Sequence, residues 1–313
     1  MQLAVGISAC LLGQKVRYDG GHKASEFCLT QLQPHVRYIA VCPENAIGMG
    51  TPRPPIRLQK NKQDEIRLVQ VKDSSLDYTD AMQQYSEQVL PGMEQLAGFV
   101  VCAKSPSCGM ERVRLYNEQG HQLGKAGVGL FTRQLMQRYP WLPVEEDGRL
   151  HDEALRENFI TRLFACHDYQ QLRGEGFSVG KLVEFHSRYK FLVMAHSPIA
   201  YRELGRLVAQ AKLFDKAELE MRYLHDFMQA LQQLSSRKTH ANVLQHLQGF
   251  FKQQLSSKER QELASLIDRY RQGHLPLMAP LTMLQHHLSR FDNKYLAAQT
   301  YLQPYPESLG LRG

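Results

Sequence analysis

Apolar and polar positions in the first 150 residues form two kinds of segment. Short apolar, β-branched runs occur at residues 3–9, 36–41, 66–71 and 98–103. Stretches with helical spacing lie between and after them, at residues 77–97 and 127–140. Strands that alternate with helices favour an open, mostly parallel sheet with helices on both faces. We therefore predict an α/β domain over residues 1–147.

The pattern changes beyond residue 151. Residues 178–197 place large apolar side chains at helical spacing, namely Leu182, Phe185, Tyr189 and Leu192. A Ser-Pro pair at 197–198 and a serine before residue 257 are helix starts, and Gly273 is a helix stop. No segment has a convincing strand pattern. We predict an all-α domain over residues 148–313, joined through a linker rich in prolines and acids at 140–152.

Composition adds a weak indication about partners. The chain has 313 residues, a length typical of about two domains. Its net charge is +7, and residues 1–150 hold 17 basic and 15 acidic residues, a net of +2 that leaves +5 for the rest. This excess is compatible with an anionic partner such as nucleic acid. No apolar run approaches the roughly 20 residues of a membrane span, and no signal peptide is recognisable, so we expect a cytoplasmic protein.

The cysteines are the strongest chemical signal. Cys10 follows the first apolar run, Cys42 follows the second, and Cys108 comes shortly after the fourth. The carboxyl ends of parallel strands share one edge of a sheet, so these three thiols can meet there. Three thiolates with an open fourth position suit either catalytic zinc or an iron–sulfur cluster with one open iron, and spacing alone does not choose between them. The other three cysteines, Cys28, Cys102 and Cys166, are expected to be small buried side chains.

Polar residues accompany these thiols. Glu44 stands two positions after Cys42, and in extended backbone the two side chains would point the same way. Beside whatever Cys42 binds, a carboxylate can accept and return protons. Ser105 precedes Cys108 by three positions. Asp19, before two glycines, is better explained as a turn residue than as a catalytic one, and it is kept as a candidate substrate contact.

Several of these motifs resemble a known family. The segments SACLLG, VRYDGGHK, VCPENAIGMGTPRPP and KSPSCG together resemble the TudS-type thiouracil desulfidases over roughly residues 1–150. The segments FHSRYKFLVMAHSPIAYRELGRLVA and HLPLMAPLTMLQHHL resemble the YbgA-type helical domain. The combination is similar to RudS-type enzymes, which remove sulfur from 4-thiouridine in tRNA. One departure is Val16, where many desulfidases have a further cysteine.

The resemblance implies a function and a cofactor. It implies a 4Fe–4S cluster held by Cys10, Cys42 and Cys108, with Glu44 as the catalytic acid and Ser105 as the active-site serine. The expected reaction is non-redox conversion of thiouridine to uridine with release of sulfide, with tRNA as the expected partner. A desulfidase of free thiouracil or thionucleosides, an iron–sulfur sensor that binds nucleic acid and a zinc hydrolase remain alternatives.

The helical half carries candidate RNA contacts. Five basic residues fall on neighbouring helical segments and could form a face that contacts phosphates: Lys181, Arg188, Lys190, Arg202 and Arg206. Each of them alone is better explained as a solvated helix residue.

Overall fold

The computed structural model describes residues 3–311 and separates the chain into two compact units. The division falls between Phe159 and Ile160, within helix α4 (Glu153–Gly174). The two are called unit 1 and unit 2, and each is described by itself. Because α4 is continuous across the division, the domain boundary after residue 147 stays a prediction.

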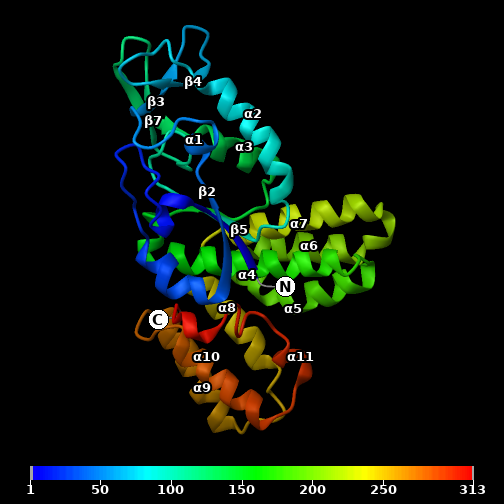
Figure 1. Ribbon diagram of the computed structural model, residues 1–313. Coiled ribbons are helices and arrows are strands. Elements are labelled where there is room, and N and C mark those ends of the chain that lie inside the picture. The colour runs from blue at the N-terminus through cyan, green and yellow to red at the C-terminus, as the bar shows by residue number, and fades with distance from the viewer. Residues whose placement is uncertain (1–2, 312–313) are drawn as a thin grey trace. The chain divides into compact units, whose positions relative to one another are not determined.

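A four-stranded parallel sheet forms the centre of unit 1. Its strand order is β2-β1-β5-β8, with β2 at Val36–Val41, β1 at Leu3–Ser8, β5 at Gly98–Val101 and β8 at Val144–Glu146 (Figure 1). Every residue of β1 and β5 is buried, which explains why these segments are continuously apolar rather than alternating.

The order of these strands creates a crevice. β2 pairs with one side of β1, and β5 pairs in parallel with the other side. The chain thus reverses the direction in which it adds strands, and ligands of open α/β sheets bind outside the carboxyl ends of the strands at such a reversal. The residues that directly follow β1 and β5 therefore occupy a favourable place for a site.

A second sheet of four strands is also part of unit 1. Its order is β4-β3-β6-β7, with β4 at Ile66–Gln70, β3 at Ile56–Lys60, β6 at Val113–Tyr116 and β7 at Gln122–Gly127 (Figure 1). Two antiparallel hairpins are joined by the parallel pair β3–β6. The segment at 66–71 was expected in the main sheet, and this placement is wrong, because its short turn from β3 permits only antiparallel pairing.

Helices complete unit 1 and confirm the α/β class. They are α1 (Pro43–Ala46), α2 (Thr79–Val89) and α3 (Leu130–Arg138). Short helical turns accompany them at η1 (Ala9–Leu12), η2 (Phe27–Leu32), η3 (Gln33–His35), η4 (Leu90–Met93) and η5 (Arg149–His151).

Unit 2 is helical over its described residues, 160–311, as predicted. Its elements after α4 are α5 (Val179–His196), α6 (Pro198–Ala209), η6 (Ala211–Leu213), α7 (Lys216–Gln232), α8 (Arg237–Gly249), α9 (Ser257–Arg271), α10 (Met278–Arg290), α11 (Lys294–Ala297) and η7 (Glu307–Leu309). Side chains at the expected starts cap their helices: Ser178 before α5, Ser197 before α6 and Ser256 before α9. A buried aromatic cluster around Phe185 and Tyr223 forms part of the core. Within residues 3–311, none of the helices has the length and apolar character needed to span a bilayer.

Candidate active site

A cavity of about 730 Å³ opens at the carboxyl edge of the parallel sheet. Four of the six cysteines line it, namely Cys10, Cys42, Cys102 and Cys108, together with Glu44 and Ser105. The three thiols expected to meet at this edge therefore share one cavity. A fourth thiol was not expected there.

Each of the three predicted thiols follows a different strand. Cys10 lies in η1 directly after β1, and Cys42 lies between β2 and α1. Cys108 is buried in the loop after β5, where its carbonyl accepts a hydrogen bond from Thr132 Oγ1 at 2.6 Å. A Cβ atom on Gly129 would come within 2.5–2.7 Å of the Ser107–Cys108 backbone, so only glycine permits this packing.

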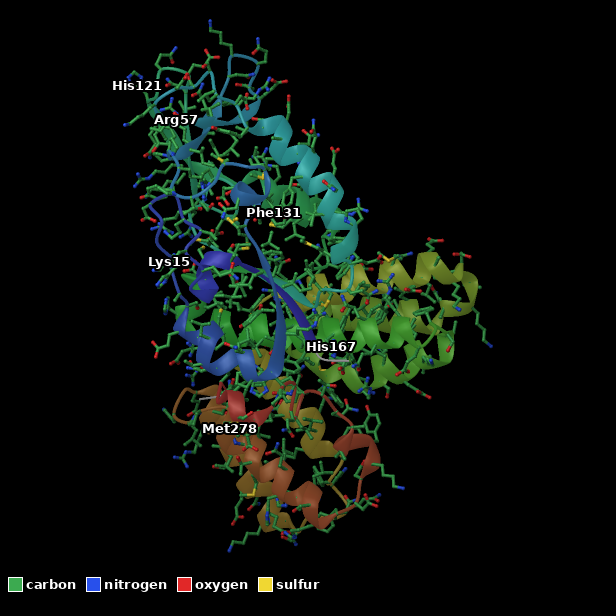
Figure 2. The ribbon with its side chains drawn as sticks, in the orientation of Figure 1. Lys15, Arg57, His121, Phe131, His167 and Met278 are labelled. Carbon is green, nitrogen blue, oxygen red and sulfur yellow. The ribbon has the colours of Figure 1, made fainter. Side chains whose placement is uncertain are left out.

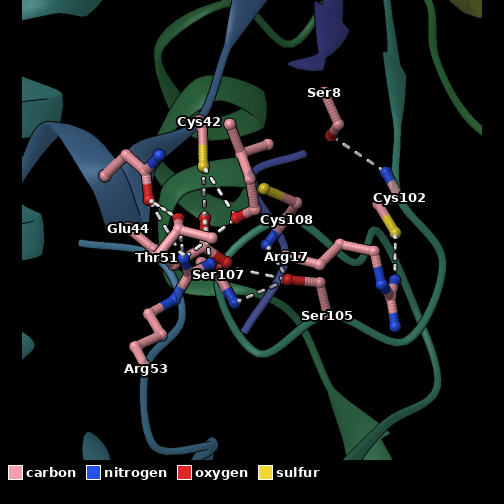
Figure 3. A network of polar contacts seen from close by, with 12 residues as sticks. Ser8, Arg17, Cys42, Glu44, Thr51, Arg53, Cys102, Ser105, Ser107 and Cys108 are labelled. Carbon is pink, nitrogen blue, oxygen red and sulfur yellow. Dashed lines mark hydrogen bonds and ion pairs between the residues drawn. The ribbon is translucent and has the colours of Figure 1, made fainter. Parts of the chain in front are cut away.

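Cys102 corrects the sequence interpretation. It follows β5 rather than lying inside the strand, and its backbone N–H donates to Ser8 Oγ at 3.0 Å. Arg17 Nη1 lies 4.0 Å from its sulfur (Figure 3). The cysteine is buried as expected, but its thiol belongs to the cavity. Cys28 and Cys166 are fully buried elsewhere, as predicted.

Glu44 is the centre of a network of polar contacts (Figure 3). This residue lies in the first turn of α1 and is only 9% exposed. Ser107 Oγ donates a hydrogen bond to Glu44 Oε1. On Oε2, the thiol of Cys42 donates at 3.4 Å, and Arg53 Nη2 lies 3.9 Å away. The carboxylate is thus oriented on both oxygens and is adjacent to a thiol of the cavity.

Ser105 lies in the loop after β5 that carries Cys108 and Ser107. Its Oγ accepts the backbone N–H groups of Cys108 at 3.1 Å and Ser107 at 3.3 Å. The hydroxyls of Ser105 and Ser107 lie 3.0 Å apart. Ser105 therefore both shapes the turn that presents Cys108 and reaches Glu44 through Ser107.

Burial and close neighbours shift the pKa values of all four thiols. A hydrogen bond to Cys102, followed by burial, raises the pKa of Cys10 well above its usual range. Burial and the adjacent Glu44 raise the pKa of Cys42 to about 11, and the same two causes raise the pKa of Cys108. The hydrogen bond that Cys10 donates lowers the pKa of Cys102, and nearby Lys23 and Arg17 act in the same direction.

Two residues of this network were not predicted. Ser107 was overlooked, although it stands two positions after Ser105 in the same small-residue motif. Arg53 was also overlooked. Besides its ion pair with Glu44, its Nη1 donates to Val16 O at 2.9 Å, Asn45 Oδ1 at 3.0 Å and Gly50 O at 2.9 Å. These bonds hold the loop after α1 against the segment that contains Val16.

Two acids near the rim have structural partners. Asp19 lines the cavity, and its Oδ1 accepts the N–H of Gly21 at 3.0 Å, which is the turn role expected. Asp147, just after β8, accepts the N–H of Ala103 at 2.8 Å and pairs with Lys23 at 2.7 Å. Asp147 therefore ties the loops after β1 and β5 to β8.

The five basic residues proposed in unit 2 have different environments. Lys181 lies 3.7 Å from Glu175, and Arg188 lies 3.7 Å from Asp168. The ammonium group of Lys190 lies over two aromatic rings, those of Phe191 and Tyr295. Arg202 and Arg206 are exposed, one turn apart on α6. The cluster is thus partly neutralised, and α6 keeps its most accessible charges.

Thiols are the ligands available here for a metal or a cluster. Within residues 3–311, no group of three or more His, Cys, Asp or Glu side chains could hold a metal ion as placed. The cavity instead collects thiols from three separate loops around a shared space. Thiolates are the usual protein ligands of iron–sulfur clusters, so this donor set suits such a group chemically.

Known proteins resemble both parts of the chain. The family model for 2-thiouracil desulfurase matches residues 5–147, and that for a protein family of unknown function, DUF1722, matches residues 190–306. The uncharacterized protein YbgA of Escherichia coli (strain K12) is 36% identical over 160 residues, which cover 50% of this chain and 93% of YbgA. The uncharacterized protein YbbK of Bacillus subtilis (strain 168) is 28% identical over 127 residues, which cover 39% of this chain and 83% of YbbK.

A solved structure is also similar in sequence. It is described as the [4Fe-4S]-dependent thiouracil desulfidase TudS, and it shares 33% identity over 50% of this chain and 99% of its own. Its TM-score is 0.39. By its matches to the two family models and to YbgA, the chain belongs to the 2-thiouracil desulfurase family over its first part and to the YbgA family over its second.

Proposed function

We propose that this protein is a desulfidase that uses an iron–sulfur cluster to replace the sulfur of a thiolated uracil by oxygen, with 4-thiouridine in tRNA as its substrate. The observation that carries the proposal is one cavity shared by Cys10, Cys42 and Cys108 and the carboxylate of Glu44. Membership of the 2-thiouracil desulfurase family supports the thiolated base as substrate. In this reaction water and the thiocarbonyl yield a carbonyl and hydrogen sulfide, with no net transfer of electrons.

The cluster would be held by Cys10, Cys42 and Cys108, one from each of three loops. Three protein thiolates leave one iron of a 4Fe–4S cluster open, and the relative described as TudS is [4Fe-4S]-dependent. When bound, the cluster would supply a soft Lewis acid that polarises the C=S bond.

Glu44 is placed to move the protons of the reaction. Its Oε2 faces the thiol of Cys42 within the cavity, while Ser107 holds Oε1. A carboxylate in this position can accept a proton from the attacking water and return one to the departing sulfur. Arg53 and Ser107 keep the carboxylate in one orientation, which favours reaction geometry before the substrate arrives.

Burial of the thiols limits access of bulk water. Cys108 is 5% exposed, and Cys42 and Cys10 are half-buried. A flat base that enters the cavity would have to leave its stack, because a thiocarbonyl inside a helix cannot reach the bottom of such a site. A thiolated base in a single-stranded or loop region therefore suits this cavity.

Anaerobic reconstitution tests the proposal. The whole chain would be loaded with iron and sulfide and incubated with bulk tRNA that contains 4-thiouridine, and separately with free 2-thiouracil and 4-thiouracil. We expect visible absorbance from the cluster, released sulfide and loss of 4-thiouridine from digested tRNA. Turnover of the free bases alone would reduce the function to nucleobase desulfidation. A fully loaded protein that releases sulfide from no substrate would refute the proposal and favour a sensor.

A further inference from the structure

A second groove in unit 1 carries a concentration of positive charge. It has a volume of about 740 Å³ and runs along the second sheet. Five cationic residues line it, and none of its lining residues is acidic: Arg57, Lys104, Arg112, Arg114 and Lys125. We call this feature the cationic groove.

The strands of the second sheet bring these charges together. Arg57 comes from β3, Arg114 from β6 and Lys125 from β7, and Leu58 on β3 pairs with Leu115 on β6. The turn between β6 and β7 passes close to Arg57, since a Cβ on Gly120 would lie 3.1 Å from Arg57 Nη1. Figure 2 shows Arg57 and His121 near each other at this end of unit 1. Residues more than 60 positions apart thus contribute to one charged surface.

Little of this charge is compensated within residues 3–311. Lys104, Arg114 and Lys125 have no carboxylate at ion-pair distance there, and Arg112 has only Glu111, at 3.5 Å, with its own side chain 76% exposed.

Arg57 is held by neutral groups. It lies over the ring of Tyr116 at 5.5 Å and donates to Gln59 Oε1 at 3.0 Å, while its buried Nε has no hydrogen-bond partner among residues 3–311. A groove of cations without internal acids is electrostatically suited to a polyanion.

The cationic groove adjoins the thiol-lined cavity. Lys104 and Arg114 line both, as do Ile56 and Pro106. A phosphate held by Lys104 or Arg114 would therefore lie beside the cavity that receives the base. This arrangement matches a chain in which charged phosphates alternate with bases.

We propose that the cationic groove binds the ribose–phosphate backbone of RNA beside the thiolated base, so that unit 1 itself grips the polynucleotide substrate. The inference rests on the proposed function, because it assigns that function a backbone-binding surface. It also explains how a half of the chain with a net charge of only +2 can attract RNA: its charges are segregated.

Binding of RNA without turnover tests this surface. An unmodified tRNA transcript would be titrated with the full chain between 50 and 200 mM salt, which needs neither thiolated base nor cluster. The test variant is Arg112→Gln with Lys125→Gln, two exposed residues that lie outside the thiol-lined cavity. The matched control is Arg37→Gln with Lys62→Gln, which removes the same charge from exposed sites of unit 1 outside the groove. A third variant, Arg202→Gln with Arg206→Gln, tests whether RNA contacts the basic residues of α6 instead.

The salt dependence separates the outcomes. Loss of two phosphate contacts should lower the slope of log affinity against log salt by roughly 1.4 to 1.8 for the test variant, with the control unchanged. An equal change in the control, or an unchanged slope in the test variant, would overturn the proposal. A change in the α6 variant alone would place the RNA contacts on unit 2 and overturn it as well. A chain that binds the transcript through the groove but releases no sulfide from any thiolated substrate would refute the proposed function and leave the binding surface standing.

Discussion

Replacing Ser107 by alanine removes one hydroxyl from the centre of the candidate active site. That hydroxyl is fully buried, donates to Glu44 Oε1 and lies 3.0 Å from the hydroxyl of Ser105. Alanine keeps the backbone of the loop and removes only the side-chain oxygen. Ser105 retains its two backbone donors, so the turn around Cys108 should persist.

The size of the effect follows from the type of bond. A hydrogen bond to a charged group contributes about 1.5–3 kcal/mol. If this bond orients Glu44 during proton transfer, its loss should lower kcat by about 10- to 150-fold, since about 1.4 kcal/mol corresponds to a factor of ten. The Michaelis constant should change little, because Ser107 acts through Glu44 as a positioning residue and does not bind the base.

The assay is sulfide release from tRNA that contains 4-thiouridine, catalysed by the reconstituted protein. Visible absorbance of the cluster and the thermal unfolding midpoint would be measured on the same sample. Ser86→Ala is a matched control, because Ser86 is equally buried and donates at 2.7 Å to the carbonyl of Met82 in α2. A Ser107→Ala protein with wild-type kcat and an intact cluster would refute the role assigned to this contact. Equal losses of kcat in both variants would indicate a general loss of stability instead.

Three further predictions concern the cluster, the proton carrier and the helical unit. Glu44→Gln should keep the visible absorbance of the cluster and lower turnover by about 10²–10⁴-fold, and near-normal turnover would contradict its role. Replacing Cys10, Cys42 or Cys108 by alanine should abolish the cluster absorbance, whereas alanine at the buried Cys28 or Cys166 should not. A colourless but folded Cys102→Ala protein would require a different set of ligands. In unit 2, burial and then Lys190 lower the pKa of His186 to about 4 from its ordinary 6.5. On acidification, His186 is therefore protonated at a higher pH in the unfolded state than in the folded state. The free energy of unfolding should fall as pH drops from 6.5 towards 4, by on the order of 2–3 kcal/mol at pH 4.5. Urea unfolding at pH 7 and 4.5 measures this difference in free energy. His186→Asn should flatten its pH dependence, and the control His225→Asn, at an exposed residue, should not.

Sequence pattern predicted the elements that carry strong local signals. The runs of β1, β2 and β5 are strongly apolar, and Ser178, Ser197 and Ser256 are recognisable caps, so these elements follow from local signals. The second sheet was not recognised, because β6 and β7 are short, partly exposed and rich in charged residues and glycine. β4 was recognised as a strand but assigned to the wrong sheet, since periodicity does not encode the pairing partner.

In the site too, features set by local sequence could be predicted, whereas contacts between residues distant in sequence could not. The positions of Cys10, Cys42 and Cys108 after the first, second and fourth apolar runs indicated a shared site at one edge of the sheet. The contact between Ser107 and Glu44 joins residues 63 positions apart, and no local pattern carries it. The cationic groove was missed because a sum of charges over 150 residues conceals their segregation on one surface.

The order of strands in the parallel sheet has a consequence for when the proposed cluster could be inserted. β1 is made first, but its second neighbour, β5, begins 95 residues after it, and Asp147, which ties their loops, comes later still. A growing chain therefore exposes Cys10 and Cys42 long before Cys108 can join them, and domains generally fold as units once they are complete. We expect the nascent thiols to remain separate until nearly all of unit 1 has left the ribosome. Cluster delivery would then act on a finished domain rather than help to fold it.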